Sequence, residues 1–81
     1  MVAIINGKKY NTETAELILT LYGGARQGFR RDYYKTKKGT YFVRYVTVGE
    51  IDLVSEETIK DLLAIYDPDK YIELFGDVEE G

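Results

Sequence analysis

The chain has 81 residues, of which 44% are hydrophobic, and it contains neither cysteine nor histidine. This length suits a single domain near the lower size limit for a hydrophobic core, and the composition excludes disulfides, zinc–thiolate sites and the commonest catalytic base. The net charge of −3 conceals a strong asymmetry, because residues 26–44 have a net charge of +6 and residues 49–81 a net charge of −9.

A short β-hairpin is predicted for residues 2–10. Its arms flank Asn6-Gly7, a pair whose residues tolerate the positive φ angles of a type I′ turn. The next segment, residues 12–22, predicts an amphipathic helix, because a threonine can cap it and apolar residues recur at helical spacing. Two glycines predict the end of this helix, and residues 25–30 are expected to form a basic loop.

A second, longer β-hairpin is predicted for residues 31–48. The tripeptide Lys37-Lys38-Gly39 suits a three-residue loop in which the glycine takes the left-handed conformation. The resulting register places these residues opposite each other: Asp32 and Arg44, Tyr33 and Val43, Tyr34 and Phe42, Lys35 and Tyr41. Gly49 predicts the end of the second strand, and residues 51–54 predict a third, short strand.

Two further helices are predicted in the acidic part of the chain. Ser55 caps the first, and Asp67-Pro68 begins the second, which ends at Gly76. The residues expected to face inward are Ile59, Leu62, Leu63 and Tyr66 on the first helix, and Tyr71, Leu74 and Phe75 on the second. The order ββαβββαα predicts an α+β fold with helices on one face of a small antiparallel sheet. One domain is expected at residues 1–76, with an acidic tail at residues 77–81.

Catalysis is not expected of this chain. Without histidine or cysteine, the remaining acid–base candidates are carboxylates, tyrosines and lysines, and helix capping and solubility explain the positions of the acids. The sequence contains neither a phosphate-binding glycine loop nor the spacing of a calcium loop, so we expect no cofactor and no metal. No apolar run approaches the ~18 residues that span a bilayer, which favours a cytoplasmic protein without membrane contact.

The central hairpin is the predicted partner-binding site. Both of its faces carry aromatic residues, but only one can pack on the helices, so the other predicts a stacking platform ringed by basic side chains. The candidate partner-binding residues are Arg30, Arg31, Tyr33, Lys35, Lys37, Lys38, Tyr41, Arg44 and Tyr45. A purely structural role stays open, since tyrosine is favoured in strands and lysine is common at turns. The net negative charge weighs against nucleic acid as the partner.

The acidic helices also have two interpretations. Carboxylates such as Glu57, Asp61, Asp69 and Glu73 fall on the outward side of the predicted helices. Such a surface is most often a solvated helix face. A protein that imitates DNA phosphates would display the same groups and attract the basic channel of a nuclease.

Three segments carry a resemblance to known proteins: residues 5–15 (INGKKYNTETA), 34–42 (YKTKKGTYF) and 71–80 (YIELFGDVEE). The chain is similar to a family of small proteins from genomes and mobile elements of Gram-positive bacteria. It departs from the longer members after Tyr45, where their glycine-rich insertion is absent. Phage and plasmid genes of this size often encode inhibitors of host defence, including anti-CRISPR proteins. The resemblance therefore implies a binding protein of phage or mobile-element type.

The leading hypothesis is a non-enzymatic protein that inhibits a host CRISPR or other defence nuclease by protein–protein contact. The first alternative is a nucleic-acid-binding regulator that uses the basic aromatic hairpin at residues 30–45. The second is an accessory or structural protein with an unknown partner. Monomer and homodimer both stay open, because an exposed hairpin edge can pair with its own copy.

Overall fold

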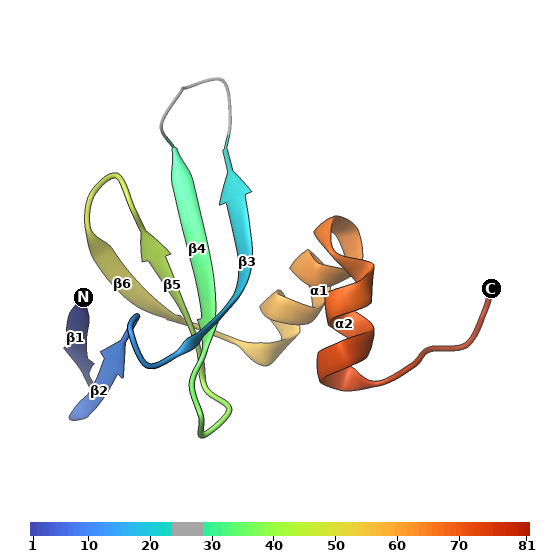
Figure 1. Ribbon diagram of the computed structural model, residues 1–81, viewed down its shortest axis with the longest axis horizontal. Coiled ribbons are helices and arrows are strands. Elements are labelled where there is room, and N and C mark those ends of the chain that lie inside the picture. Colours follow the sequence, from blue (N-terminus) through green and yellow to red (C-terminus); the bar gives the residue numbers. More distant parts are fainter. Residues whose placement is uncertain (24–28) are drawn as a thin grey trace.

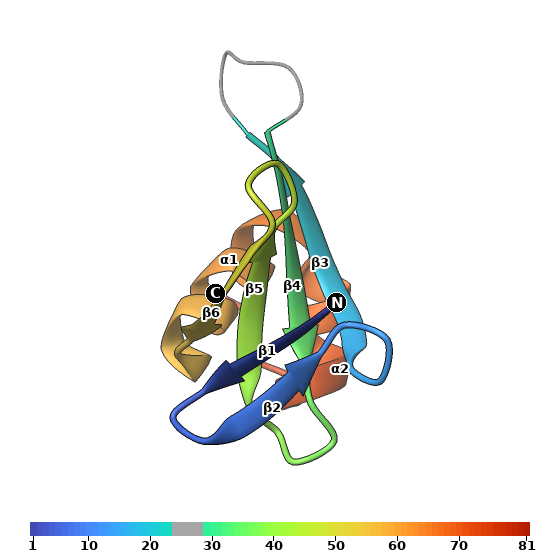
Figure 2. The same ribbon diagram turned by 90° about the vertical axis from the view of Figure 1, so that its left-hand side faces the viewer.

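The computed structural model describes residues 1–23 and 29–81 and arranges them in three layers (Figure 1). The middle layer is an antiparallel sheet with the strand order β3 (Glu16–Tyr22), β4 (Arg30–Lys35), β5 (Tyr41–Tyr45) and β6 (Glu50–Val54). The outer layers are the helices α1 (Glu56–Tyr66) and α2 (Pro68–Phe75) on one face, and a hairpin of β1 (Val2–Ile5) and β2 (Lys8–Asn11) on the other (Figure 2). The predicted α+β fold is confirmed.

The N-terminal hairpin has the predicted turn. Asn6 and Gly7 have φ angles of 53° and 75°, the left-handed conformation that a type I′ turn requires at both positions. Strand β1 pairs antiparallel with β2, with Ala3 opposite Tyr10. Tyr10 is only 5% exposed, which shows that this ribbon packs its inner side on the sheet.

The predicted first helix is wrong, because residues 16–22 form strand β3. The run from Leu17 to Leu21 contains apolar residues at helical spacing, but an apolar run of this length also suits a buried strand. A register shift between Leu17 and Leu19 marks a β-bulge, and Ile18 and Leu19 both enter the cluster on the helix side. Tertiary packing therefore overrides the helical spacing in this segment.

A turn organised by Asn11 replaces the first part of that predicted helix. The Asn11 side-chain Oδ1 accepts a hydrogen bond from the Glu13 N–H at 2.9 Å, and its carbonyl oxygen accepts one from the Ala15 N–H at 3.1 Å. Asparagine favours such local bonds, which compete with helix formation. The basic loop predicted for residues 25–30 falls largely outside the described residues; Arg30 itself begins β4.

The central hairpin has the predicted register. All four predicted pairs are confirmed, including Tyr34 with Phe42 and Asp32 with Arg44. Gly39 has a φ of 89°, and the Gly39 N–H donates to the Thr36 carbonyl oxygen at 2.9 Å. The second strand ends at Tyr45 rather than at residue 48, and β6 then confirms the predicted third strand.

Both C-terminal helices begin as predicted. Ser55 Oγ accepts a hydrogen bond from the Thr58 N–H at 3.1 Å, and Asp67 Oδ1 accepts one from the Lys70 N–H at 3.2 Å. Ile59 and Leu63 are fully buried, but Tyr66 is 59% exposed, so its predicted inward position is wrong. Tyr66 is the last residue of α1. Neither helix in the described ranges is long and apolar enough to cross a membrane.

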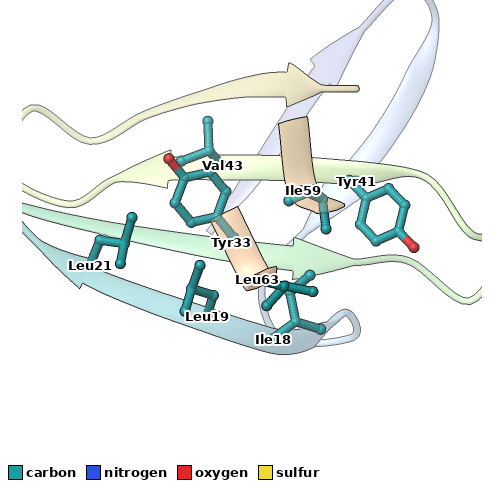
Figure 3. Close-up of a cluster of buried hydrophobic side chains, with 8 residues drawn as sticks. All are labelled: Ile18, Leu19, Leu21, Tyr33, Tyr41, Val43, Ile59 and Leu63. Atoms are coloured by element: carbon teal, nitrogen blue, oxygen red, sulfur yellow. The ribbon is translucent and has the colours of Figure 1, made fainter. Parts of the chain in front are cut away.

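Two hydrophobic clusters hold the layers together. The cluster between the sheet and the helices contains Ile18, Leu19, Leu21, Tyr33, Tyr41, Val43, Ile59 and Leu63 (Figure 3). The cluster between the sheet and the N-terminal hairpin contains Tyr10, Tyr34, Phe42 and Ile51. The sheet therefore buries aromatic residues on both of its faces, which explains why strands β4 and β5 carry them on both sides.

Candidate functional site: a lysine groove between two hairpins

The aromatic stacking platform predicted for the central hairpin is wrong. Tyr33 and Tyr41 are 5% and 6% exposed and lie under the helices. On the opposite face, the N-terminal hairpin covers Tyr34 and Phe42. Burial raises the pKa of the Tyr33 and Tyr41 phenols, so both stay neutral at physiological pH. Their rings are not available for stacking on bases.

The predicted arginines lie near the other end of the hairpin from its lysine-bearing turn. Arg30, Arg31 and Arg44 are about six residues along the strands from that turn, roughly 20 Å at the rise of a β-strand. Arg30 Nε donates to Asp32 Oδ1 at 2.9 Å, so the 2% exposed Asp32 pairs with Arg30 rather than with its cross-strand neighbour Arg44. Tyr45 packs on the helix-side cluster. These four residues therefore do not join the lysines in one site.

The lysines at the turn lie beside lysines that were not predicted. A groove of about 420 Å³ lies between the N-terminal hairpin and the turn that follows β4. These two segments of the chain lie at the lower edge of Figure 2. We call it the lysine groove. It is lined by Lys8, Lys9, Tyr10, Asn11, Thr14, Ala15, Thr36, Lys37, Lys38 and Thr40. Four lysines from two separate hairpins thus surround one hollow.

Each hairpin turn places one pair of these lysines. The type I′ turn at Asn6-Gly7 leads directly into Lys8 and Lys9 of β2. On the other side, Gly39 closes the turn that exposes Lys37 and Lys38, and Thr36 Oγ1 accepts the Thr40 N–H at 3.1 Å. The buried ring of Tyr10 fixes β2 against the sheet, because it meets the Phe42 ring edge-on at 5.6 Å. The packing of β2 on the sheet therefore holds the two lysine pairs close to each other.

The groove is positively charged and has no acidic lining. None of its ten lining residues carries a carboxylate. Within residues 1–23 and 29–81, ion pairs involve Arg30 and Lys70 but none of the four groove lysines. Lys60 is also occupied, since its Nζ lies 5.0 Å from the centre of the Phe75 ring. An anion entering the groove would therefore meet four ammonium groups that form no ion pair with a described carboxylate.

A second hollow continues the groove along the same surface. It shares Thr14, Ala15, Thr36 and Lys37 with the lysine groove and adds Glu16 and Lys35. Glu16 is bound to Lys70 Nζ at 2.8 Å, and this bond lowers the pKa of the Glu16 carboxyl. The carboxylate at this end is thus already paired, and Lys35 extends the row of lysines.

The lining residues that sequence reasoning missed are Lys8, Lys9, Tyr10, Asn11, Thr14, Ala15, Thr36 and Thr40. A signal for two of them was present, because a lysine pair directly follows the Asn-Gly turn. Over residues 1–25, however, Lys8 and Lys9 are offset by Glu13 and Glu16, so the net charge of this segment is zero. Charge summed along the chain therefore hides a cluster that forms only when two hairpins meet.

Comparison of the chain with protein-family models, with curated proteins and with solved structures finds no match. The resemblance to small proteins of Gram-positive mobile elements stays a prediction. The lysine groove is therefore the feature of the molecule from which a function can be inferred.

Proposed function

We propose that this chain is a non-enzymatic protein that binds the phosphate backbone of nucleic acid in the lysine groove. The observation that carries the proposal is the meeting of Lys8 and Lys9 with Lys37 and Lys38 around a hollow without carboxylates. Lysine, threonine and asparagine are side chains that commonly contact phosphate and sugar. The adjoining hollow adds Lys35 beside the Glu16 carboxylate, which is paired with Lys70, and this longer row of lysines suits a row of phosphates better than a single anion.

The proposed binding does not depend on base sequence. The only aromatic lining residue is Tyr10, which is 5% exposed, so the groove offers little ring surface on which bases could stack. Without base contacts, affinity comes from phosphate neutralisation and counterion release. We therefore expect weak, sequence-independent binding at physiological salt.

A salt titration tests this proposal. Four lysine–phosphate contacts on a single strand predict that log K falls against log salt with a slope of about −3. Fluorescence anisotropy with a labelled oligonucleotide measures this slope, and oligonucleotides of different base composition should give the same value. Absence of binding at about 50 mM salt, or affinity that follows base sequence rather than salt, would contradict it.

Inhibition of a defence nuclease by protein contact is a second proposed function. The observation that favours it is the exposure of Glu57, Asp61, Asp69 and Glu73 on the helices, on the far side of the sheet from the N-terminal hairpin. A surface of carboxylates can compete with DNA for the basic channel of a nuclease. We expect the purified protein to slow DNA cleavage by a host CRISPR nuclease and to co-purify with it. Full nuclease activity with excess protein, and no co-purification, would reject this function.

A further inference from the structure

The outer surface of the two helices contains an apolar hollow. It has a volume of about 260 Å³ and is lined by Ala64, Pro68, Tyr71, Ile72 and Val78. We call these five residues the helix-pair patch. Ile72 and Val78 are 42% and 58% exposed. The inward residues of α2, such as Leu74 and Phe75, pack on the sheet, so Ile72 is left on the side away from the core.

The surroundings of this patch are acidic. Residues 61–81 contain seven carboxylate side chains and only one basic side chain, Lys70. Lys70 forms ion pairs with both Glu16 and Glu73, and these bonds raise its pKa, so its charge is already compensated. The exposed carboxylates are those of Asp61, Asp69, Glu73, Asp77, Glu79 and Glu80. A partner that covers the patch must therefore approach through a negative field.

We propose that the helix-pair patch binds a cationic amphipathic helix of another protein. Such a helix places apolar side chains along one stripe, which would fill the hollow beside Ile72, while its lysines and arginines meet the surrounding carboxylates. The proposal goes beyond the second proposed function, because it names the chemistry of a protein partner. It does not require that this partner be a nuclease, and it is independent of the lysine groove.

Charge complementarity selects this occupant over the alternatives. A phosphate backbone would be repelled by the carboxylates around the patch. A second copy of this chain could not supply a cationic helix, because α1 and α2 are themselves acidic. Apart from Lys60 and Lys70, the basic side chains of the described residues lie on strands and turns. A cationic amphipathic helix from a different protein can fill the apolar hollow and also pair its basic side chains with the surrounding carboxylates.

The test uses a labelled synthetic peptide in which leucine and lysine alternate with helical periodicity over about four turns. We expect micromolar binding by fluorescence anisotropy, with at least roughly tenfold weaker binding of a scrambled peptide of the same composition. The variant Ile72→Gln should lose roughly tenfold in affinity because it removes an apolar contact. Ile4→Gln is the matched control, since Ile4 is 67% exposed on the N-terminal hairpin; it should bind like the parent protein.

Three results would overturn the proposal. The first is equal binding of the ordered and scrambled peptides, which would show attraction by charge alone. The second is unchanged peptide affinity of Ile72→Gln. The third is concentration-dependent self-association in sedimentation that Ile72→Gln abolishes, since a second copy would then be the occupant. A variant with Lys37 and Lys38 changed to glutamate should bind the peptide normally, so failure of the lysine groove and failure of the patch are distinguishable.

Discussion

Changing Lys37 and Lys38 together to glutamate should weaken binding to a single strand at least tenfold at about 50 mM salt and reduce the salt slope by about 1.4. Both side chains are exposed on the turn after β4 and line the lysine groove. The change removes two phosphate contacts and places two like charges against the ligand. Fluorescence anisotropy across a salt series measures both quantities.

The matched variant on the other wall distinguishes the groove from a single basic turn. Changing Lys8 and Lys9 to glutamate should cause a loss of similar size, because both residues line the same hollow from β2. Lys60→Glu is the control for net charge, since Lys60 lies on α1 over the Phe75 ring. It should change the affinity for nucleic acid by less than about threefold, because salt screens a charge that is distant from the groove. A large loss of affinity in the variant of residues 37 and 38, with no loss in the variant of residues 8 and 9, would contradict a binding groove formed by both hairpins.

Replacing Phe42 by alanine should remove a large share of the free energy of unfolding. Phe42 is 0% exposed; its ring stacks on that of Tyr34 at 5.1 Å and meets that of Tyr10 at 5.6 Å. Truncating a buried phenylalanine costs about 3–5 kcal/mol, against a total of about 4–12 kcal/mol for a domain of this size. Urea unfolding followed by circular dichroism measures the loss.

Two further variants show whether the N-terminal hairpin is part of the core. Tyr10→Ala should also destabilise the fold by several kcal/mol, because Tyr10 is 5% exposed and contacts the Phe42 ring. Val48→Ala is the control at a turn residue that is 67% exposed, and it should shift the free energy of unfolding by less than about 0.5 kcal/mol. A neutral Tyr10→Ala would contradict the packing of β2 on the sheet.

The turns of this fold were predictable from sequence because their signals are local. Asn6-Gly7 and Gly39 require left-handed backbone, and that requirement fixes both the position of each hairpin and its register. The strand at residues 16–22 was not predictable in the same way. Its apolar residues suit either a helix or a buried strand, and pairing with β4 together with packing under the C-terminal helices decides between them.

The candidate site was predictable only in part, for a related reason. Lys35, Lys37 and Lys38 are adjacent to the turn that the sequence identifies, and the structure places them at the groove and its continuation. Tyr33 and Tyr41 were predicted to bind a partner because one face of a sheet with a single helical layer is free, and which face that is stayed open; both rings in fact lie under the helices. The prediction did not foresee that the N-terminal hairpin would cover the opposite face.

The N-terminal hairpin gives the lysine groove a thermodynamic link to folding. One wall of the groove belongs to β2, which is held on the sheet by side-chain packing around Tyr10 and Phe42. A polyanion that bridges both walls binds only when this layer is docked, so occupancy favours the docked state by mass action. Conversely, any change that loosens the hairpin lowers apparent affinity without touching a lysine. The free energy that packs a small ribbon of chain would then also contribute to the strength of the proposed ligand binding.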